Sequence, residues 1–160
     1  MKKLVFLSTV FAAIFMAGCS SKAPTTTTTT NNEDMYSKDM ASIINGINSR
    51  VQNIYFDFDK FNIRADQQGA INRNAAIFNS GDAMDLRILV EGNCDEWGSD
   101  EYNYALGVKR AKTAKDALVA QGVSENRIEI ASNGESKPVC TERSKACDAQ
   151  NRRDEFRVMQ

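Results

Sequence analysis

The chain has 160 residues, with 20 basic and 21 acidic side chains and no histidine, and its formal net charge is −1. A balance so close to neutrality argues against nucleic-acid binding, which needs a basic patch. Because histidine is the commonest general base and the commonest metal ligand, its absence leads us to expect a binding protein without catalytic residues, metal or cofactor.

The first 18 residues have the features of an export signal. Two lysines precede an uncharged stretch, residues 4–17, which is too short to span a bilayer permanently. The stretch runs into Met16-Ala17-Gly18-Cys19, which resembles the lipobox of bacterial lipoproteins. The resemblance implies cleavage before Cys19 and lipidation of its thiol, with palmitate among the acyl chains. The alternative is an ordinary secretory signal followed by an incidental cysteine.

Residues 19–38 are predicted to form a lipidated cysteine followed by a disordered tether. The segment is polar and includes six consecutive threonines at positions 25–30. Such a composition buries too little apolar surface to offset the entropy lost on ordering. The folded domain is therefore expected at residues 39–160, which is enough chain for a single core.

Two helices and two strands are predicted in the first half of the folded part. Apolar residues at helical spacing predict a short amphipathic helix over about residues 35–50, and a second helix ends near residue 80. Strict alternation predicts one strand over residues 54–58 and another over residues 86–90.

The second half begins with a long helix. Ser99 is a good N-terminal cap, acidic residues follow it, and Gln121-Gly122 ends the helix. Short strands are predicted at residues 128–130 and 156–158, with a cysteine-bearing loop between them. This order of elements predicts an α/β (α+β) two-layer sandwich, with the helices packed on one face of a small mixed β-sheet.

The loop over residues 91–99 is the first candidate site. It lies at the carboxyl end of a predicted strand, where open α/β sheets usually bind their ligands. The N-terminus of the following helix favours an anion, whereas Asp95 and Glu96 favour a cation. A zwitterionic ligand would satisfy both.

Arg110 is an anomaly in the long helix, because it occupies the middle of an apolar row spaced by four residues. Asn103 lies on nearly the same face. One explanation is that Arg110 extends its stem over the core and keeps its guanidinium in water. The other is a partly buried guanidinium fork directed at a carboxylate, with Asp95 as the second residue of the dyad.

Four separated motifs carry a resemblance to a known family: Tyr55-Phe56-Asp57-Phe58-Asp59-Lys60, then Glu91 through Asn103, then Leu106-Gly107-Val108-Lys109-Arg110-Ala111, and Asn151-Arg152-Arg153. They resemble the OmpA-like domain and, more narrowly, the peptidoglycan-associated lipoproteins. The resemblance implies a non-covalent ligand, the diaminopimelate of the peptidoglycan stem peptide. It places Asp95 and Arg110 on opposite walls of one cleft. The other ligand-binding residues that it implies are Asn103, Asn151 and Arg152, and Asp57 borders the cleft.

The resemblance also implies a role and a location. We expect a lipid-anchored protein of the outer membrane whose domain faces the periplasm and tethers the membrane to the cell wall. We also expect it to take part in the Tol-Pal system and in cell division, with TolB as a partner. One alternative is an anchoring module of another envelope complex. A cell-wall hydrolase using Asp95 and Glu96 is disfavoured, because no nucleophile–base pair or metal set is visible.

The remaining residues of interest have structural interpretations. Cys140 and Cys147 are expected to form a disulfide in an oxidising compartment, and Cys94 to remain a free, mostly buried thiol. Asp57 and Asp59 are expected to be solvated or to cap a helix rather than to bind a metal. Trp97 stands where the family commonly has an arginine. We expect its side chain to be a partly buried aromatic of the loop rather than a group that stacks on a ligand.

Overall fold

The computed structural model of the protein describes residues 30–160, so the predicted signal peptide, Cys19 and the tether up to residue 29 lie outside the described residues. Within the described part of the chain, no helix combines the length and the apolar character needed to cross a membrane. The helices and strands are α1 (Thr30–Asn48), β1 (Ile54–Tyr55), α2 (Gln68–Phe78), β2 (Arg87–Asn93), α3 (Asp100–Ala120), β3 (Ile128–Gly134), α4 (Lys145–Asn151) and β4 (Arg153–Met159).

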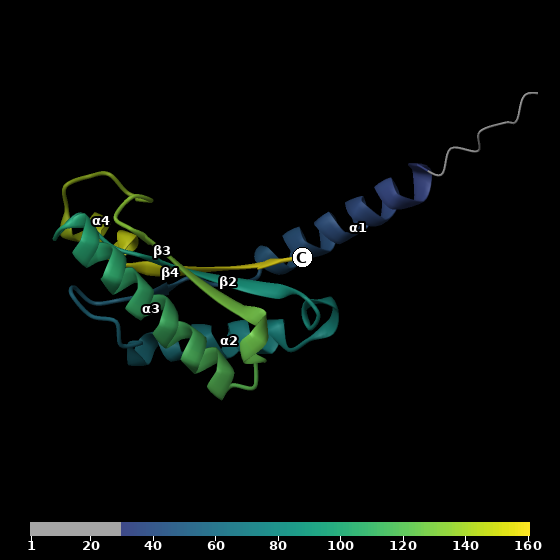
Figure 1. The fold of residues 1–160 in the computed structure, drawn as a ribbon. Helices are drawn as coiled ribbons and strands as arrows, with labels where there is room; N and C mark the ends of the chain where they lie inside the picture. The colour runs from purple at the N-terminus through teal and green to yellow at the C-terminus, as the bar shows by residue number, and fades with distance from the viewer. Residues whose placement is uncertain (1–29) are drawn as a thin grey trace, which may run out of the picture.

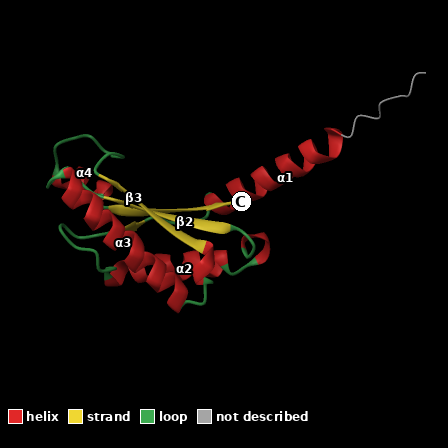
Figure 2. Cartoon of the chain, in the orientation of Figure 1, coloured by secondary structure: helices red, strands yellow, loops and turns green. Residues whose placement is uncertain are grey.

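The four strands form one mixed sheet in the order β1-β4-β2-β3 (Figure 2). Strand β4 runs antiparallel to both β1 and β2, whereas β2 and β3 are parallel, with Ile88 opposite Ile128. Because β2 and β3 point the same way, the loops that follow Asn93 and Gly134 leave the same edge of the sheet. This edge carries the candidate site.

Helices α2 and α3 lie together on one face of the sheet, and α1 lies at the end of the molecule where the chain terminates (Figure 1). Side chains from both layers meet in a buried core: Ile71, Ala75, Phe78, Ala111, Ala114 and Leu118 from the helices, and Ile88, Val90, Ile128, Phe156 and Val158 from the sheet. The predicted two-layer arrangement on a mixed sheet is confirmed.

Two glycines let α3 approach β2 closely. A Cβ atom added at Gly92 would stand 2.0 Å from the carbonyl oxygen of Gly107, and one at Gly107 would stand 2.2 Å from Ser132 Oγ. Neither position therefore admits a side chain without separating the helix from the sheet. The close approach brings the first half of α3, with Asn103 and Arg110, over the loop that follows β2.

Three elements differ from the predictions. The first strand stops at Tyr55 instead of residue 58, because the chain turns at Asp59, which has a positive φ of 56°. Helix α1 starts at Thr30, so the last nine residues assigned to the tether, 30–38, are helical; a helix propagates readily beyond the part that is packed. The predicted cysteine-bearing loop contains α4, which Ser144 caps by accepting from the Cys147 amide.

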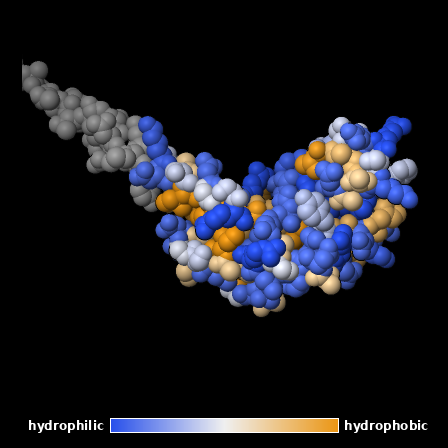
Figure 3. All heavy atoms as spheres, turned by 180° about the vertical axis from the view of Figure 1, so that it is seen from behind, coloured by the Kyte–Doolittle hydropathy of each residue, from blue (hydrophilic) through white to orange (hydrophobic). Residues whose placement is uncertain are grey.

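The other face of the sheet is charged. Arg87 pairs with Glu129 and Arg157 with Glu91 across neighbouring strands. From behind, the surface is mostly hydrophilic, and hydrophobic residues gather toward the end where α1 lies (Figure 3). A sheet face that is satisfied by ion pairs needs no further protein layer against it.

Candidate functional site

Asp95 lies two residues beyond the end of β2 and is almost completely buried, with 4% of its surface exposed. Its Oδ2 accepts from Arg152 Nη1 at 2.8 Å, and Arg152 Nε donates to the Phe56 carbonyl at 3.1 Å. The Asp95 backbone carbonyl accepts from Asn103 Nδ2. The sequence placed these residues at one site, and the structure brings them together.

Arg110 is completely buried beneath this site. Its guanidinium donates to three backbone carbonyls, those of Lys60 at 2.9 Å, Asn93 at 2.8 Å and Asp57 at 3.3 Å. It also lies 5.1 Å from the centroid of the Phe56 ring. Burial lowers the pKa of the Arg110 guanidinium.

In the described structure Arg110 forms no exposed wall opposite Asp95, because it has no exposed surface; its contact with a ligand stays a prediction. The turn over residues 57–60 covers Arg110, and its carbonyls replace water around the guanidinium. Arg152, rather than Arg110, is the partner of the Asp95 carboxylate. The Arg110 guanidinium is thus not in water, so the first interpretation of the helical pattern is wrong. The second interpretation, a buried fork that meets a carboxylate of the ligand beside Asp95, stays a prediction.

Asn103 and Asn151 hold loops in place. The Asn103 amide nitrogen donates to the Asp95 carbonyl and to the Glu135 carboxylate, and so ties the loops after β2 and β3 together. The Asn151 side chain accepts from the Val139 and Cys140 amides and donates to the Cys140 carbonyl. Both side chains act on the backbone of the site's loops.

Asp57 contributes through its backbone, not its carboxylate. Its carbonyl holds Arg110, whereas its side chain is exposed and pairs with Arg64 at 3.6 Å. The Asp59 carboxylate accepts from the Tyr102 hydroxyl, which raises the pKa of Tyr102. These two aspartates therefore have separate partners and do not face one another across a metal position.

The cysteines follow the prediction. Cys140 and Cys147 form a disulfide, with Cα atoms 5.2 Å apart, and Cys94 is a buried free thiol. Cys94 Sγ lies 3.3 Å from the Asn103 carbonyl. Burial raises the pKa of Cys94 to about 11.

Three adjoining clefts meet at Trp97. The acidic cleft, of about 240 Å³, is lined by Phe58, Asp59, Asp95, Trp97, Gly98, Tyr102 and Leu106. The middle cleft, of about 360 Å³, is lined by Phe58, Trp97, Lys145, Asp148 and Arg152. The outer cleft, of about 550 Å³, is lined by Glu96, Trp97, Arg143, Ser144, Lys145 and Asp148. The Asp95–Arg152 pair thus lies between the acidic and middle clefts.

The aromatic lining of these clefts was missed. Trp97 was expected to be partly buried but is 58% exposed, and Phe58, the last residue of the strand predicted over residues 54–58, is 59% exposed. Tyr102, from the apolar row of the long helix, is 50% exposed. Tyr102 lies in the first turn of α3, the turn that follows the cap residue, where a side chain can reach past the end of the sheet. This position in the sequence could have indicated that Tyr102 is exposed.

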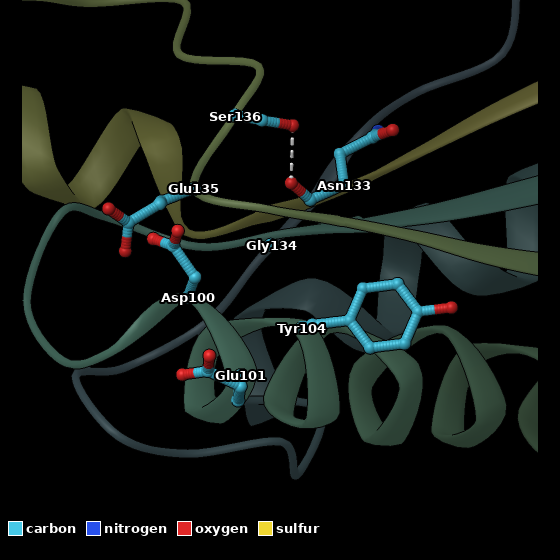
Figure 4. A pocket seen from close by; sticks show the side chains of 7 residues that line it. All are labelled: Asp100, Glu101, Tyr104, Asn133, Gly134, Glu135 and Ser136. Atoms are coloured by element: carbon cyan, nitrogen blue, oxygen red, sulfur yellow. Dashed lines mark hydrogen bonds between the residues drawn. The ribbon is translucent and has the colours of Figure 1, made fainter.

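A fourth cleft lies on the other side of the start of α3. It measures about 640 Å³ and is lined by Asp100, Glu101, Tyr104, Asn133, Gly134, Glu135 and Ser136. Figure 4 shows the carboxylates gathered at one end and the Tyr104 ring further along the helix. None of the ligand-binding residues predicted from the sequence lines it.

Asp154 is a buried acid that the sequence analysis did not single out. It has no exposed surface, and neither carboxyl oxygen has a hydrogen-bond partner among the described residues. Burial raises the pKa of Asp154 well above its usual range, although the charge of Arg110 acts in the opposite direction. The alternation of β4 contained the signal, since Asp154 shares the inward-facing parity of Phe156 and Val158.

Known proteins resemble the chain in sequence and in structure. The OmpA family profile matches residues 55–152. The peptidoglycan-associated lipoprotein of Haemophilus influenzae is 33% identical over 157 residues, which cover 95% of this chain and 94% of that protein. Its counterpart in Pasteurella multocida is 37% identical over 110 residues, 69% of this chain and 72% of the relative. The crystal structure of the peptidoglycan-associated lipoprotein from Burkholderia pseudomallei matches with a TM-score of 0.64 and 37% identity, covering 68% of this chain and 90% of that one.

Proposed function

Because the chain belongs to the OmpA family and, within it, to the peptidoglycan-associated lipoproteins, we propose that it is an outer-membrane lipoprotein that binds peptidoglycan without covalent bonds. In this proposal the lipid on Cys19 holds the chain to the outer membrane, and residues 39–160 face the periplasm and hold the cell wall. The protein thereby links the two layers of the envelope.

The proposed ligand is the diaminopimelate of the stem peptide, whose side chain ends in a carbon that bears an ammonium and a carboxylate. Asp95 and Asp59 in the acidic cleft suit the ammonium, and Arg152 in the adjoining middle cleft suits the carboxylate. The observation that carries the proposal is the Asp95–Arg152 pair, which presents opposite charges side by side at the junction of two clefts.

The other residues implied by the family support these two groups. Arg110 acts from beneath, holding the turn that carries Asp57 and the end of β2. Asn103 fixes the backbone of Asp95, and Asn151 fixes the loop that leads into α4. A hydrolase is not supported, because the Asp95 carboxylate already accepts a hydrogen bond from Arg152 Nη1.

We extend the proposal to the Tol system, with TolB as a partner in envelope integrity and cell division. Its support is the match to peptidoglycan-associated lipoproteins over nearly the whole chain, the N-terminal part included. Copurification of TolB with the chain from cross-linked cells tests this part. An anchoring module of another complex would instead recover other envelope proteins and no TolB.

Cosedimentation with purified sacculi tests the cell-wall ligand. Asp95→Asn keeps the shape of the side chain but removes its charge, and we expect at least about a 30-fold loss of affinity, as is typical when one member of a desolvated charge pair is lost. Asp116→Asn is the matched control, because Asp116 is an exposed aspartate of α3 paired with Lys112. Circular dichroism confirms that each variant is folded. Parent-like sedimentation of Asp95→Asn would place the site elsewhere.

A further inference from the structure

Three large aromatic side chains surround the acidic cleft and stand well out of the protein. Phe58, Trp97 and Tyr102 are each at least half exposed, and all three line this cleft beside Asp95. Trp97 and Phe58 continue into the middle cleft. Exposed aromatic surface gathered at one place marks an interaction site more often than solvent-facing packing does.

The surroundings of these rings fix their positions. Trp97 Nε1 donates to Asp148 Oδ2 at 3.1 Å, and the Tyr102 hydroxyl donates to Asp59. Phe58 precedes Asp59, whose positive φ sets the turn. Asp148 itself lies in α4, which the disulfide and the Asn151 hydrogen bonds hold in place. Rings that are already ordered lose little entropy when a ligand stacks on them.

The chemistry between the rings favours a sugar. The middle and outer clefts are lined by charges of both signs: the carboxylates of Glu96 and Asp148, and the cations of Arg143, Lys145 and Arg152. An apolar protein surface would desolvate these groups without pairing them. A sugar ring offers C–H faces to the aromatic rings and hydroxyl or amide donors to the carboxylates.

We propose that the outer cleft, with Trp97 as the wall that it shares with the middle cleft, binds an N-acetylated sugar of the glycan strand. This rests on the proposed function, since the sugar is the one joined to the stem peptide whose diaminopimelate occupies the acidic cleft. Two extended residues span about 7 Å, so the sugar lies within reach of the neighbouring clefts. The volume of the outer cleft, about 550 Å³, is that of a small-molecule site.

Calorimetry with two synthetic ligands separates the sugar from the peptide. One ligand is the tripeptide L-Ala-γ-D-Glu-meso-diaminopimelate, and the other is the same tripeptide joined to N-acetylglucosaminyl-N-acetylmuramic acid. We expect Trp97→Ala to weaken the disaccharide ligand about tenfold, as for a truncated aromatic contact, and the bare tripeptide by no more than about threefold, since Trp97 is only one wall of the acidic cleft. Trp97→Phe, which keeps a ring face, retains most of the affinity for the disaccharide ligand.

Tyr104→Ala is the matched control, because Tyr104 is an aromatic residue of similar exposure, 57%, that lies on α3 and lines the fourth cleft instead (Figure 4). The Tyr104→Ala variant should bind both the disaccharide ligand and the bare tripeptide with the affinity of the parent. Trp97 is the single tryptophan of the chain, so its fluorescence should change more on binding the disaccharide ligand than on binding the bare tripeptide.

Two results would overturn the sugar site: Trp97→Ala weakening both ligands equally, or weakening neither. The proposed function is tested separately in the same series through Asp95→Asn. If this variant loses both ligands while Trp97→Ala binds both like the parent, the peptide site stands and the sugar site is wrong. If Asp95→Asn also binds like the parent, the proposed function fails as well.

Discussion

Arg152 Nη1 lies 2.8 Å from Asp95 Oδ2, and the two side chains are only 13% and 5% exposed. Each charge has been taken out of water and depends on the other for compensation. Arg152 directly precedes β4, and Asp95 lies in the loop after β2. The pair therefore joins two segments that are 57 positions apart in the sequence. It is therefore part of the fold as well as the centre of the proposed site.

Removing one member of this pair should destabilise the protein. Asp95→Ala leaves the Arg152 guanidinium buried without its carboxylate, and we expect the free energy of unfolding to fall by about 3 kcal/mol. Asp95→Ala combined with Arg152→Ala should lose less than the sum of the single variants, because no uncompensated charge remains. Urea unfolding of the four proteins measures this coupling. Strictly additive losses would show that the two groups do not support one another.

Arg110 should matter for stability even though it has no exposed surface. Arg110→Ala leaves a cavity and removes the donor from three carbonyls, for an expected loss of at least about 3 kcal/mol in urea unfolding. Arg110→Lys should recover only part, because one ammonium cannot reproduce the planar fork. Lys112→Ala, on the exposed side of α3, should cost less than about 0.5 kcal/mol. Equal losses for Arg110→Ala and Lys112→Ala would contradict the described contacts.

Asp154 should make stability depend on pH. Since burial raises its pKa, the folded chain keeps a proton that the unfolded chain releases. The free energy of unfolding therefore falls as pH rises above the unfolded pKa of about 3.9, until the folded pKa is passed. Asp154→Asn removes this dependence, with a difference in slope approaching about 1.4 kcal/mol per pH unit. Urea unfolding of both proteins at a series of pH values from about 3.9 upward tests this prediction, and parallel pH profiles for the two proteins would refute it.

Cys94 should be chemically silent in the folded protein. Its thiol is buried and its pKa is raised to about 11, so almost none is thiolate near neutral pH. Iodoacetamide should leave the native chain's Cys94 unmodified and should alkylate it after denaturation, whereas Cys140 and Cys147 should react only after reduction as well. Mass spectrometry counts the modifications. Rapid native labelling at Cys94 would mean that the loop opens readily.

Local patterns predicted the parts of the fold that depend on local chemistry. Ser99 caps α3 as expected, and Gly122, with a φ of 87°, follows the end of the helix at Gln121. Alternation also located β2 and β4. The early end of β1 was not predictable from alternation, since Phe58 keeps the parity of a core residue but faces solvent after the chain turns at Asp59.

The site was predicted in composition but not in arrangement. Asp95 follows the strand end where ligands bind, and that position is visible in the sequence. The partners of Arg110 are not visible, because two of the three carbonyls that it meets, those of Asp57 and Lys60, belong to a turn some 50 positions earlier in the chain. Helical periodicity shows that Arg110 faces the core, but only the tertiary fold shows that backbone oxygens, instead of water, meet it there.

The most direct test of the account is the contribution of the ligand's side-chain ammonium to affinity. Calorimetry on the full chain compares L-Ala-γ-D-Glu-meso-diaminopimelate with the same tripeptide carrying 2-aminopimelate, which lacks only that ammonium. We predict that the diaminopimelate ligand binds at least about 30-fold more tightly to the parent, and that Asp95→Asn reduces this preference to a few-fold. Equal affinity of the parent for the two tripeptides would contradict recognition of the diaminopimelate ammonium by Asp95.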